Sequence, residues 1–286
     1  MLRGALAGVV VAVMLTAQAP PARPPILGLA HVRLMTSDLG KARHFYGDLL
    51  GFSEVPQASP LVAIFRVNDR QHIIVRSGLP PERGDRFVDV AWETADVSAM
   101  STYLRGHGVD AREAEDAGEG QGRALEMLDP DGHHVRVIQL TTARLPDGAA
   151  DRRISRRILH TGLTIRSAQA ADGFYKDVLG FSEIWRGGRP EGTINWINMR
   201  APEGTDYLEY MLTTAPPDRK QLGTFHHIAL LVPDIQAALE TVRERTAPTD
   251  PNHRAVPQIG VNRRWQLNVY DPDGTRIEFM EPWPMR

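Results

Sequence analysis

Cysteine is absent from the 286-residue sequence. Its absence excludes disulfide bridges, thiolate zinc sites, a cysteine nucleophile and a lipid-modified cysteine near the N-terminus. Any metal ion bound by this chain must therefore be held by histidine and carboxylate side chains.

An excess of one charge is also lacking, because 33 Lys and Arg are balanced by 35 Asp and Glu, a formal net charge of −2. Such a surface has no general attraction for nucleic acid or for an anionic membrane. The one dense basic stretch contains Arg152, Arg153, Arg156 and Arg157, and we interpret it as a solvated linker. The composition favours a small-molecule partner and leaves oligomer formation open.

No apolar run reaches the roughly 20 residues that a membrane-spanning helix needs. The longest, Ala5 to Ala17, follows Arg3 and precedes Ala17-Gln18-Ala19. This order is typical of a secretory signal peptide, and the prolines that follow suit an extended linker. We therefore expect residues 1–25 to be signal and linker, and the protein to be secreted or periplasmic. Pro20, directly after Ala19, leaves the cleavage site open, and retention of the segment as an anchor is the alternative.

An internal repeat organises the remaining sequence. The segment HFYGDLLGFSE, from His44 to Glu54, returns as GFYKDVLGFSE, from Gly173 to Glu183. The segment DPDGHHVRVIQL, which starts at Asp129, is matched by DPDGTRIEFMEP, which starts at Asp271. Two copies of the same pair of motifs imply two related domains in tandem.

Each domain in turn divides into two similar modules. In the second domain, LHTGLTIRSAQAADGFYKDVLGF and FHHIALLVPDIQAALETVRER each contain a short apolar strand, a polar turn and an amphipathic helix. β-Rich runs follow, among them INWINMR, DYLEYML, WQLNVY and RIEFME. We predict an α+β fold with domains 26–144 and 156–286 joined by a linker, 145–155. Each domain is a pair of βαβββ modules that form a cupped mixed sheet able to enclose a ligand.

Four potential metal ligands occupy equivalent positions in the two modules of the second domain. His160 and His227 begin the first strands, and Glu209 and Glu278 lie in the last strands. A pseudo-twofold relation between the modules brings both pairs to the centre of the cup, because alternate strand residues face it. Two imidazoles and two carboxylates suit one Zn, Ni, Co, Mn or Fe ion with two positions open for oxygens of water or substrate.

The first domain lacks this set of ligands. His31 is retained, but Asp89 stands in place of the second histidine and Arg136 in place of the second glutamate. The counterpart of the first glutamate falls on His72 or Ile74, neither of which is a carboxylate. Since a cation at a ligand position repels a metal ion, we expect this domain to be metal-free and structural, or to form a wall or partner surface for the other.

The segments FYKDVLGF, HHIALLVPD and DPDGTRIEF resemble motifs of the vicinal-oxygen-chelate superfamily. That superfamily includes glyoxalase I, methylmalonyl-CoA epimerase, extradiol ring-cleaving dioxygenases and bleomycin-resistance proteins. The resemblance covers nearly all of the chain after the predicted signal. The glyoxalase I ligand pattern corresponds here to His160, Glu209, His227 and Glu278, all of which are present. His226 is expected to point to the opposite face of its strand.

The resemblance to glyoxalase I implies a metal-dependent isomerase, epimerase or lyase that acts on a small carbonyl or hydroxy compound. In this chemistry the cation stabilises an enediolate or enolate while a carboxylate removes an adjacent proton. The resemblance gives Glu278 the role of a mobile ligand and base, and Glu209 that of the retained ligand or second base. A glutathione substrate is not expected, because an exported protein meets little glutathione.

Two alternatives stay open. Tandem domains with a metal only in the second resemble Fe(II) extradiol dioxygenases, although Asp206, Tyr207 and Asn268 occupy the positions of the acid/base histidine and tyrosine of that pattern. The second alternative is a non-enzymatic binding or resistance protein, a type that usually lacks the metal ligands. Trp196 and Arg189 are among the residues that could meet a ligand in the cup, but we prefer core packing and a solvated turn for them.

Overall fold

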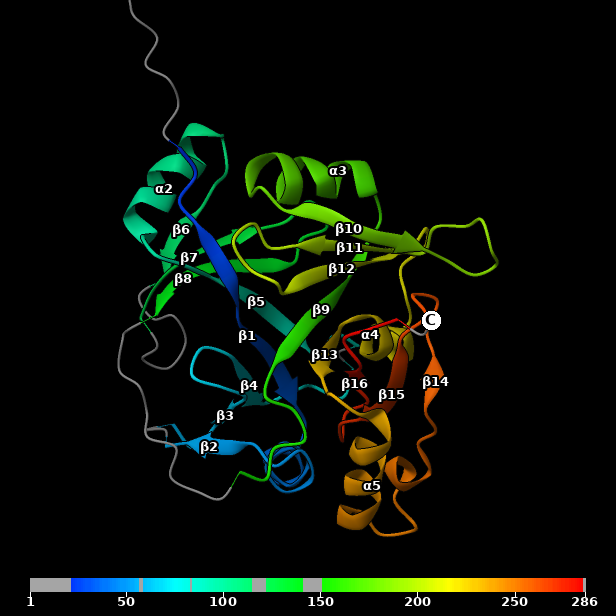
Figure 1. Ribbon diagram of the computed structural model, residues 1–286. Helices are drawn as coiled ribbons and strands as arrows, with labels where there is room; N and C mark the ends of the chain where they lie inside the picture. Colours follow the sequence, from blue (N-terminus) through cyan, green and yellow to red (C-terminus); the bar gives the residue numbers. More distant parts are fainter. Residues whose placement is uncertain (1–21, 57–58, 83, 115–121, 141–150, 285–286) are drawn as a thin grey trace, which may run out of the picture.

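The computed structural model describes residues 22–56, 59–82, 84–114, 122–140 and 151–284 as two similar domains (Figure 1). Almost all of the predicted signal and linker, and most of the linker predicted between the domains, lie outside these ranges. The predictions of export and of a signal peptide therefore stay predictions.

Each domain contains one eight-stranded mixed sheet. The first sheet has the order β2-β3-β4-β1-β5-β8-β7-β6, with β1 (Ile26–Thr36), β2 (Ser53–Val55), β3 (Val62–Arg66), β4 (His72–Ser77), β5 (Phe87–Thr94), β6 (Arg112–Ala114), β7 (Gly122–Leu128) and β8 (His134–Leu140). The second has the order β10-β11-β12-β9-β13-β16-β15-β14, with β9 (Ile158–Ile165), β10 (Ser182–Gly187), β11 (Trp196–Arg200), β12 (Tyr207–Leu212), β13 (His227–Leu231), β14 (Gln258–Ile259), β15 (Trp265–Tyr270) and β16 (Arg276–Met280).

The two modules of each domain meet at a central antiparallel pair of strands. β1 pairs with β5 in the first sheet, and β9 with β13 in the second. On either side of this pair lies a parallel neighbour from the same module, such as β12 beside β9 and β16 beside β13. This arrangement confirms the predicted α+β fold of two tandem domains, each built from two βαβββ modules.

The helices are short, and the repeated FYxDxLGF motif does not form the regular helix that its pattern predicts. The motif forms the π-helices η1 (His44–Leu49) and η2 (Gly173–Val178), and Gly51 and Gly180 follow them with a φ of +79°. Only glycine adopts this left-handed conformation without strain. No helix within the described ranges is long and apolar enough to cross a membrane. The helical segments are α1 (Leu39–Arg43), η1 (His44–Leu49), α2 (Val97–Gly106), α3 (Ala168–Asp172), η2 (Gly173–Val178), α4 (Arg219–Phe225), α5 (Ile235–Arg245) and η3 (Pro251–Arg254).

Alternate residues of the central strands face opposite sides of the sheet. In β12, Leu208 and Tyr210 belong to the main apolar core, which also contains Leu239 and Val242 of α5. Glu209, between them, lies on the other face. A shift of one residue in strand pairing would exchange the two faces, so the register that forms the core also decides which side chains are available for chemistry.

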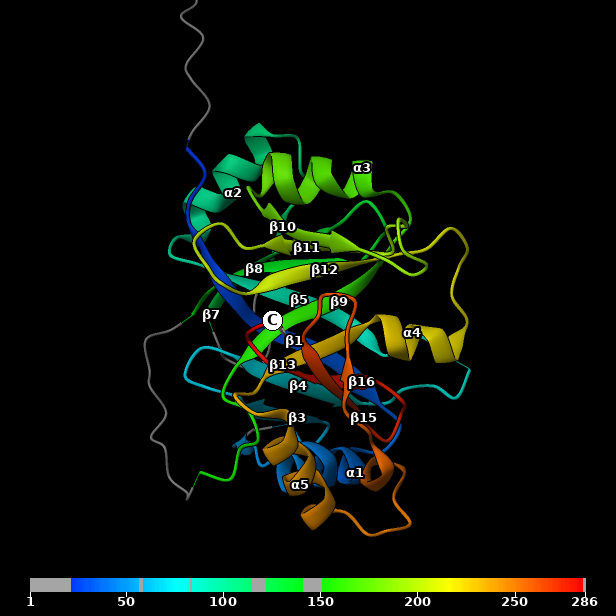
Figure 2. The same cartoon turned by 45° about the vertical axis from the view of Figure 1, so that its right-hand side comes forward.

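Helices of the two domains lie side by side at both ends of the molecule. Figure 2 shows α2 beside α3 at one end and α1 beside α5 at the other. The Tyr103 hydroxyl of α2 donates to the Val178 carbonyl at 2.7 Å, and Arg245 of α5 donates through Nη1 to the Leu49 carbonyl at 2.9 Å. Helical segments of the two domains are therefore in direct contact at both ends of the molecule.

The repeated motifs join the domains through two reciprocal hydrogen bonds. The Tyr46 hydroxyl donates to Asp271 Oδ2 and the Tyr175 hydroxyl donates to Asp129 Oδ2, each at 3.0 Å. Both tyrosines are fully buried. Thus the FY motif of each domain supports the DPDG turn of the other domain, and in the second domain that turn leads directly into β16.

Replacing Tyr46 or Tyr175 by Phe removes one of these bonds and leaves a buried carboxylate with one donor fewer. We expect each variant to lose about 1.5–3 kcal/mol of unfolding free energy, since the acceptor is charged, as measured by urea denaturation. Tyr270, whose side chain is exposed, provides the control, and Tyr270→Phe should stay within about 0.5 kcal/mol of the parent. Equal stability of all three variants would show that the reciprocal bonds do not hold the domains together.

Candidate metal centre

Four adjacent strands, β12, β9, β13 and β16, each supply one of the predicted ligands. Their register aligns two rows of residues across the sheet: Glu209–Gly162–His227 and His160–Ala229–Glu278. The rows are two residues apart along the shared strands, so all four side chains lie on the same face. The pseudo-twofold relation predicted from the spacing therefore brings the two His/Glu pairs together.

A small residue in the middle of each row leaves space for the imidazoles. Gly162 lies between Glu209 and His227, and a Cβ atom at this position would be 2.2 Å from both Cε1 and Nδ1 of His227. Such a Cβ atom would overlap with the imidazole ring of His227. Ala229 occupies the corresponding position in the other row. The absence of a side chain at Gly162 thus helps to fix the position of His227.

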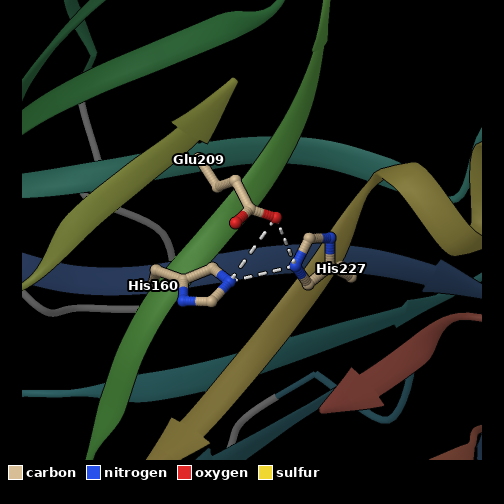
Figure 3. Close-up of side chains that lie close together, drawn as sticks. All are labelled: His160, Glu209 and His227. Atoms are coloured by element: carbon tan, nitrogen blue, oxygen red, sulfur yellow. Dashed lines mark hydrogen bonds and ion pairs between the residues drawn. The ribbon is translucent and has the colours of Figure 1, made fainter. Parts of the chain in front are cut away.

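The donor atoms lie within a few ångströms of one another, and Figure 3 shows three of the four side chains, His160, Glu209 and His227. The two Nε2 atoms of His160 and His227 are 3.0 Å apart, and Glu278 Oε2 is 3.6 Å from each of them. Glu209 Oε2 is 3.5 Å from His227 Nε2 and 4.0 Å from His160 Nε2. Donor atoms that share one ion at about 2.1 Å are about 3 Å apart when adjacent and about 4 Å when opposite. The donor atoms of His160, Glu209 and His227 all lie within 4.8 Å of one another and suit a single ion. Glu278 lies outside this group of three, although its Oε2 is close to both imidazoles.

Burial prepares both histidines for a cation, and a hydrogen bond orients His227. Both are buried, and burial lowers the pKa of each well below the usual value, so both imidazoles are neutral. His227 Nδ1 lies 2.9 Å from the Phe225 carbonyl, so this nitrogen carries the proton and Nε2 presents its lone pair to the centre. The His160 ring stacks on Tyr207 at 4.5 Å between centroids.

The two glutamates lie in the same buried space. Burial and then the charge of Glu278 raise the pKa of Glu209 to about 8, and burial raises the pKa of Glu278. The nearby Arg276 guanidinium acts in the opposite direction on both. Two buried carboxylates are costly unless a cation compensates them. Together with two neutral nitrogens they form a donor set that suits a divalent metal.

The strands of the first domain align two equivalent rows of residues, but the side chains in these rows differ. Its rows are Ile74–Arg33–Asp89 and His31–Ala91–Arg136. The register therefore assigns the place of Glu209 to Ile74, and not to His72, which settles the choice that the sequence left open. Ile74 packs in a small apolar cluster with Val62 and Ile64. An apolar side chain at this place offers no ligand.

Arginine side chains occupy the centre of the first domain. Asp89 Oδ2 lies 2.7 Å from Arg33 Nη1 and 3.3 Å from Arg136 Nε, and Asp89 Oδ1 lies 3.1 Å from His31 Nε2. Arg33 is at the position that Gly162 holds in the second domain. The guanidinium groups thus supply, within the protein, the positive charge that a metal ion would bring.

His226 bonds away from the candidate centre, as its predicted orientation requires. Its Nδ1 is 2.9 Å from Asp85 Oδ1 of the first domain, and its Nε2 is 2.9 Å from the Thr164 hydroxyl. The carboxylate of Asp206, at the position of the dioxygenase acid/base histidine, is bound by Arg157 Nε at 3.0 Å. Neither side chain is directed to the four converging ligands.

A cavity of about 160 Å³ opens beside Glu209 and Glu278. Trp196 and Arg189 line it. Trp196 is only partly buried and is not part of the apolar core, whereas Arg189 is exposed in the segment after β10, as the solvated-turn interpretation expects. Sequence reasoning also missed Trp185 and Arg276. Arg276 could have been found, because it precedes Glu278 by two residues in one strand and so shares its face. Trp185 could not, because a register shift in the pairing of β10 with β11 brings it opposite Asn198.

Comparison with known proteins identifies the family of this chain. The family model described as "Glyoxalase/Bleomycin resistance protein/Dioxygenase superfamily" matches residues 28–137 and 157–279. A manganese-dependent 2,3-dihydroxybiphenyl 1,2-dioxygenase of Geobacillus genomosp. 3 is 23% identical over 293 residues, 90% of each chain. A lactoylglutathione lyase of Haemophilus influenzae is 33% identical over 127 residues, which are 44% of this chain and 92% of the lyase.

A solved structure shares the two-domain fold. The homoprotocatechuate 2,3-dioxygenase of Arthrobacter globiformis superposes with a TM-score of 0.72 at 18% identity, covering 94% of this chain and 84% of the dioxygenase. The family model spans both domains, and the resemblance seen in the motifs is confirmed. The chain belongs to the glyoxalase/bleomycin resistance protein/dioxygenase superfamily.

Proposed function

We propose that this protein is a metal-dependent enzyme of the glyoxalase I type, an isomerase, epimerase or lyase that transfers a proton on a small carbonyl or hydroxy compound. The observation that carries the proposal is the convergence of His160, Glu209 and His227, whose donor atoms are 3.0–4.0 Å apart. Glu278 Oε2 lies 3.6 Å from both imidazoles and completes the set. A second carboxylate in this set favours proton transfer, because it provides a base in addition to a ligand.

The four side chains have different roles in this proposal. His160 and His227 hold a divalent ion, Zn, Ni, Co, Mn or Fe, since both are neutral and buried. Such an ion, when bound, stabilises negative charge that develops on a substrate oxygen. Glu278, which would also help to hold such an ion, accepts the proton from the neighbouring carbon, and burial, which raises its pKa, makes it a stronger base. Glu209 stays as a ligand or acts as the second base.

The size of the cavity restricts the substrate. A cavity of about 150 Å³ in another protein holds benzene, and the volume here is about 160 Å³. A molecule of this size fits, whereas a glutathione conjugate, the substrate named for the Haemophilus relative, would lie largely outside. We propose a small substrate for this reason.

A ring-cleaving dioxygenase is the second candidate. It is favoured by the manganese-dependent relative, which aligns with 90% of this chain, both domains included. Three observations argue against a dioxygenase. Glu209 is an additional carboxylate beside the histidines. Asp206, at the position of the acid/base histidine, forms an ion pair with Arg157, and Asn268 stands where the dioxygenase pattern has tyrosine. Proton transfer therefore remains the main proposal.

One set of assays separates these two activities. Protein purified without added metal is incubated with small hydroxy and carbonyl compounds in D2O, and deuterium incorporation is followed by NMR. Incorporation next to the carbonyl is expected, without oxygen consumption when catechol or 2,3-dihydroxybiphenyl is added in an oxygen electrode. Catechol-dependent oxygen uptake with no deuterium exchange would transfer the assignment to the dioxygenase.

The glutamates are expected to respond differently to amide substitution. Glu278→Gln removes the base and should lower the exchange rate by about 100-fold or more while metal is retained. Glu209→Gln should lower metal content as well, because the retained ligand is weakened. Glu240→Gln, at an exposed position of α5, is the control and should match the parent. Full exchange activity in Glu278→Gln would exclude Glu278 as the base.

Metal affinity is expected to increase with pH. In the metal-free protein the raised pKa of Glu209, about 8, keeps a proton on that carboxyl which the ion must displace. Affinity should therefore rise by at least about tenfold per pH unit up to about pH 8 and then level off, and the raised pKa of Glu278 acts in the same direction. The histidines add no slope, because their pKa values are lowered. Competition with a chromophoric chelator measures this profile, and a flat profile from about pH 6 to about pH 8 would contradict the assignment.

A further inference from the structure

The cavity beside the candidate centre contains an arginine that the metal chemistry does not use. Arg276 lies in β16 two residues before Glu278 and lines the cavity with it. Its Nε is buried and has no hydrogen-bond partner among the residues that the structure describes. The arginines at the centre of the first domain differ, because Arg33 and Arg136 both pair with Asp89.

The charges around the cavity leave one positive charge to be balanced. Two neutral imidazoles, two carboxylates and a divalent ion sum to zero net charge. The Arg276 guanidinium then remains as a cation in a partly buried space, where lack of a partner is costly. Arg189, at the same cavity, adds a second positive charge. An anionic group on the ligand would balance these charges.

The other walls suit a flat ring. Trp185 and Trp196 line the cavity from β10 and β11, and both are on the same sheet face as Glu209, because Asn198 pairs with Trp185 and with Glu209 and lies two residues from Trp196. Indole side chains pack favourably against planar apolar groups. The volume of about 160 Å³ accommodates one ring.

We propose that the cavity binds a ring-sized carboxylic acid. Its carboxylate pairs with the Arg276 guanidinium, its ring packs against Trp185 and Trp196, and two further oxygens are directed to the candidate metal centre. The charge balance and the last part of this arrangement rest on the proposed function, whereas the positions of Arg276 and of the two indoles are properties of the cavity itself. A guanidinium forms bidentate charge-assisted hydrogen bonds with a carboxylate, so Arg276 determines specificity for acids over neutral analogues.

A matched pair of probes tests this inference. 2,3-Dihydroxybenzoate and catechol both carry two vicinal oxygens on one ring, and only the first carries a carboxylate. Binding to the metal-containing protein is measured by calorimetry under argon, so that no oxygen chemistry occurs. The acid should bind at least about tenfold more tightly than catechol. In Arg276→Gln the ratio should fall to within about twofold through weaker binding of the acid, with both affinities measured on protein whose metal content has been matched to that of the parent.

Arg243→Gln, an exposed substitution on α5, is the control and should keep the parent ratio. Equal affinity of the parent for the two probes, no measurable binding of the acid, or an unchanged ratio in Arg276→Gln would overturn the inference. Failure of the proposed function looks different. In that case chelation of the metal leaves the affinity for both probes unaltered, while the acid is still preferred over catechol.

Discussion

The register between β9 and β13 is the constraint on which the candidate centre depends. This antiparallel pair joins the two modules of the second domain and places His160 and His227 within 3.0 Å of each other through their Nε2 atoms. The parallel neighbours β12 and β16 then add one glutamate each. A slip of one residue would send the ligands into the apolar core and core residues into the cup. Core packing and metal chemistry are therefore fixed by the same strand pairing.

The two domains balance the buried charges at their centres in different ways. In the first domain, Asp89 is surrounded by Arg33, Arg136 and His31, and the buried charges neutralise one another inside the protein. In the second domain, the buried carboxylates have no comparable cation in direct contact among the described residues. The first domain also supports the second physically, because Tyr46 holds the DPDG turn before β16. The two copies of the repeat thus differ in how the buried charges at equivalent positions are balanced.

Much of the candidate site could be predicted because the duplicated modules repeat the same residue types at nearly equal spacing in the sequence. The equal spacing of histidines and glutamates, combined with strand alternation, placed all four ligands on one face. Local pattern did not reveal the π-helical form of the FYxDxLGF motif, since apolar periodicity cannot separate it from an α-helix over so few residues. The choice between His72 and Ile74 required the actual register. The bond from Tyr46 to Asp271 joins segments 225 residues apart, and no local signal predicts such a pair.

The central claim is that one cation lies between the four converging side chains. Crystals of protein prepared without added metal, measured above and below the absorption edges of Mn, Fe, Co, Ni and Zn, test it most directly. The account predicts a single anomalous peak about 2.0–2.3 Å from Nε2 of His160, Nε2 of His227 and a carboxylate oxygen of each glutamate. It also predicts no peak beside Asp89. A fully ordered site without a peak, even after soaking with these metals, would contradict the account.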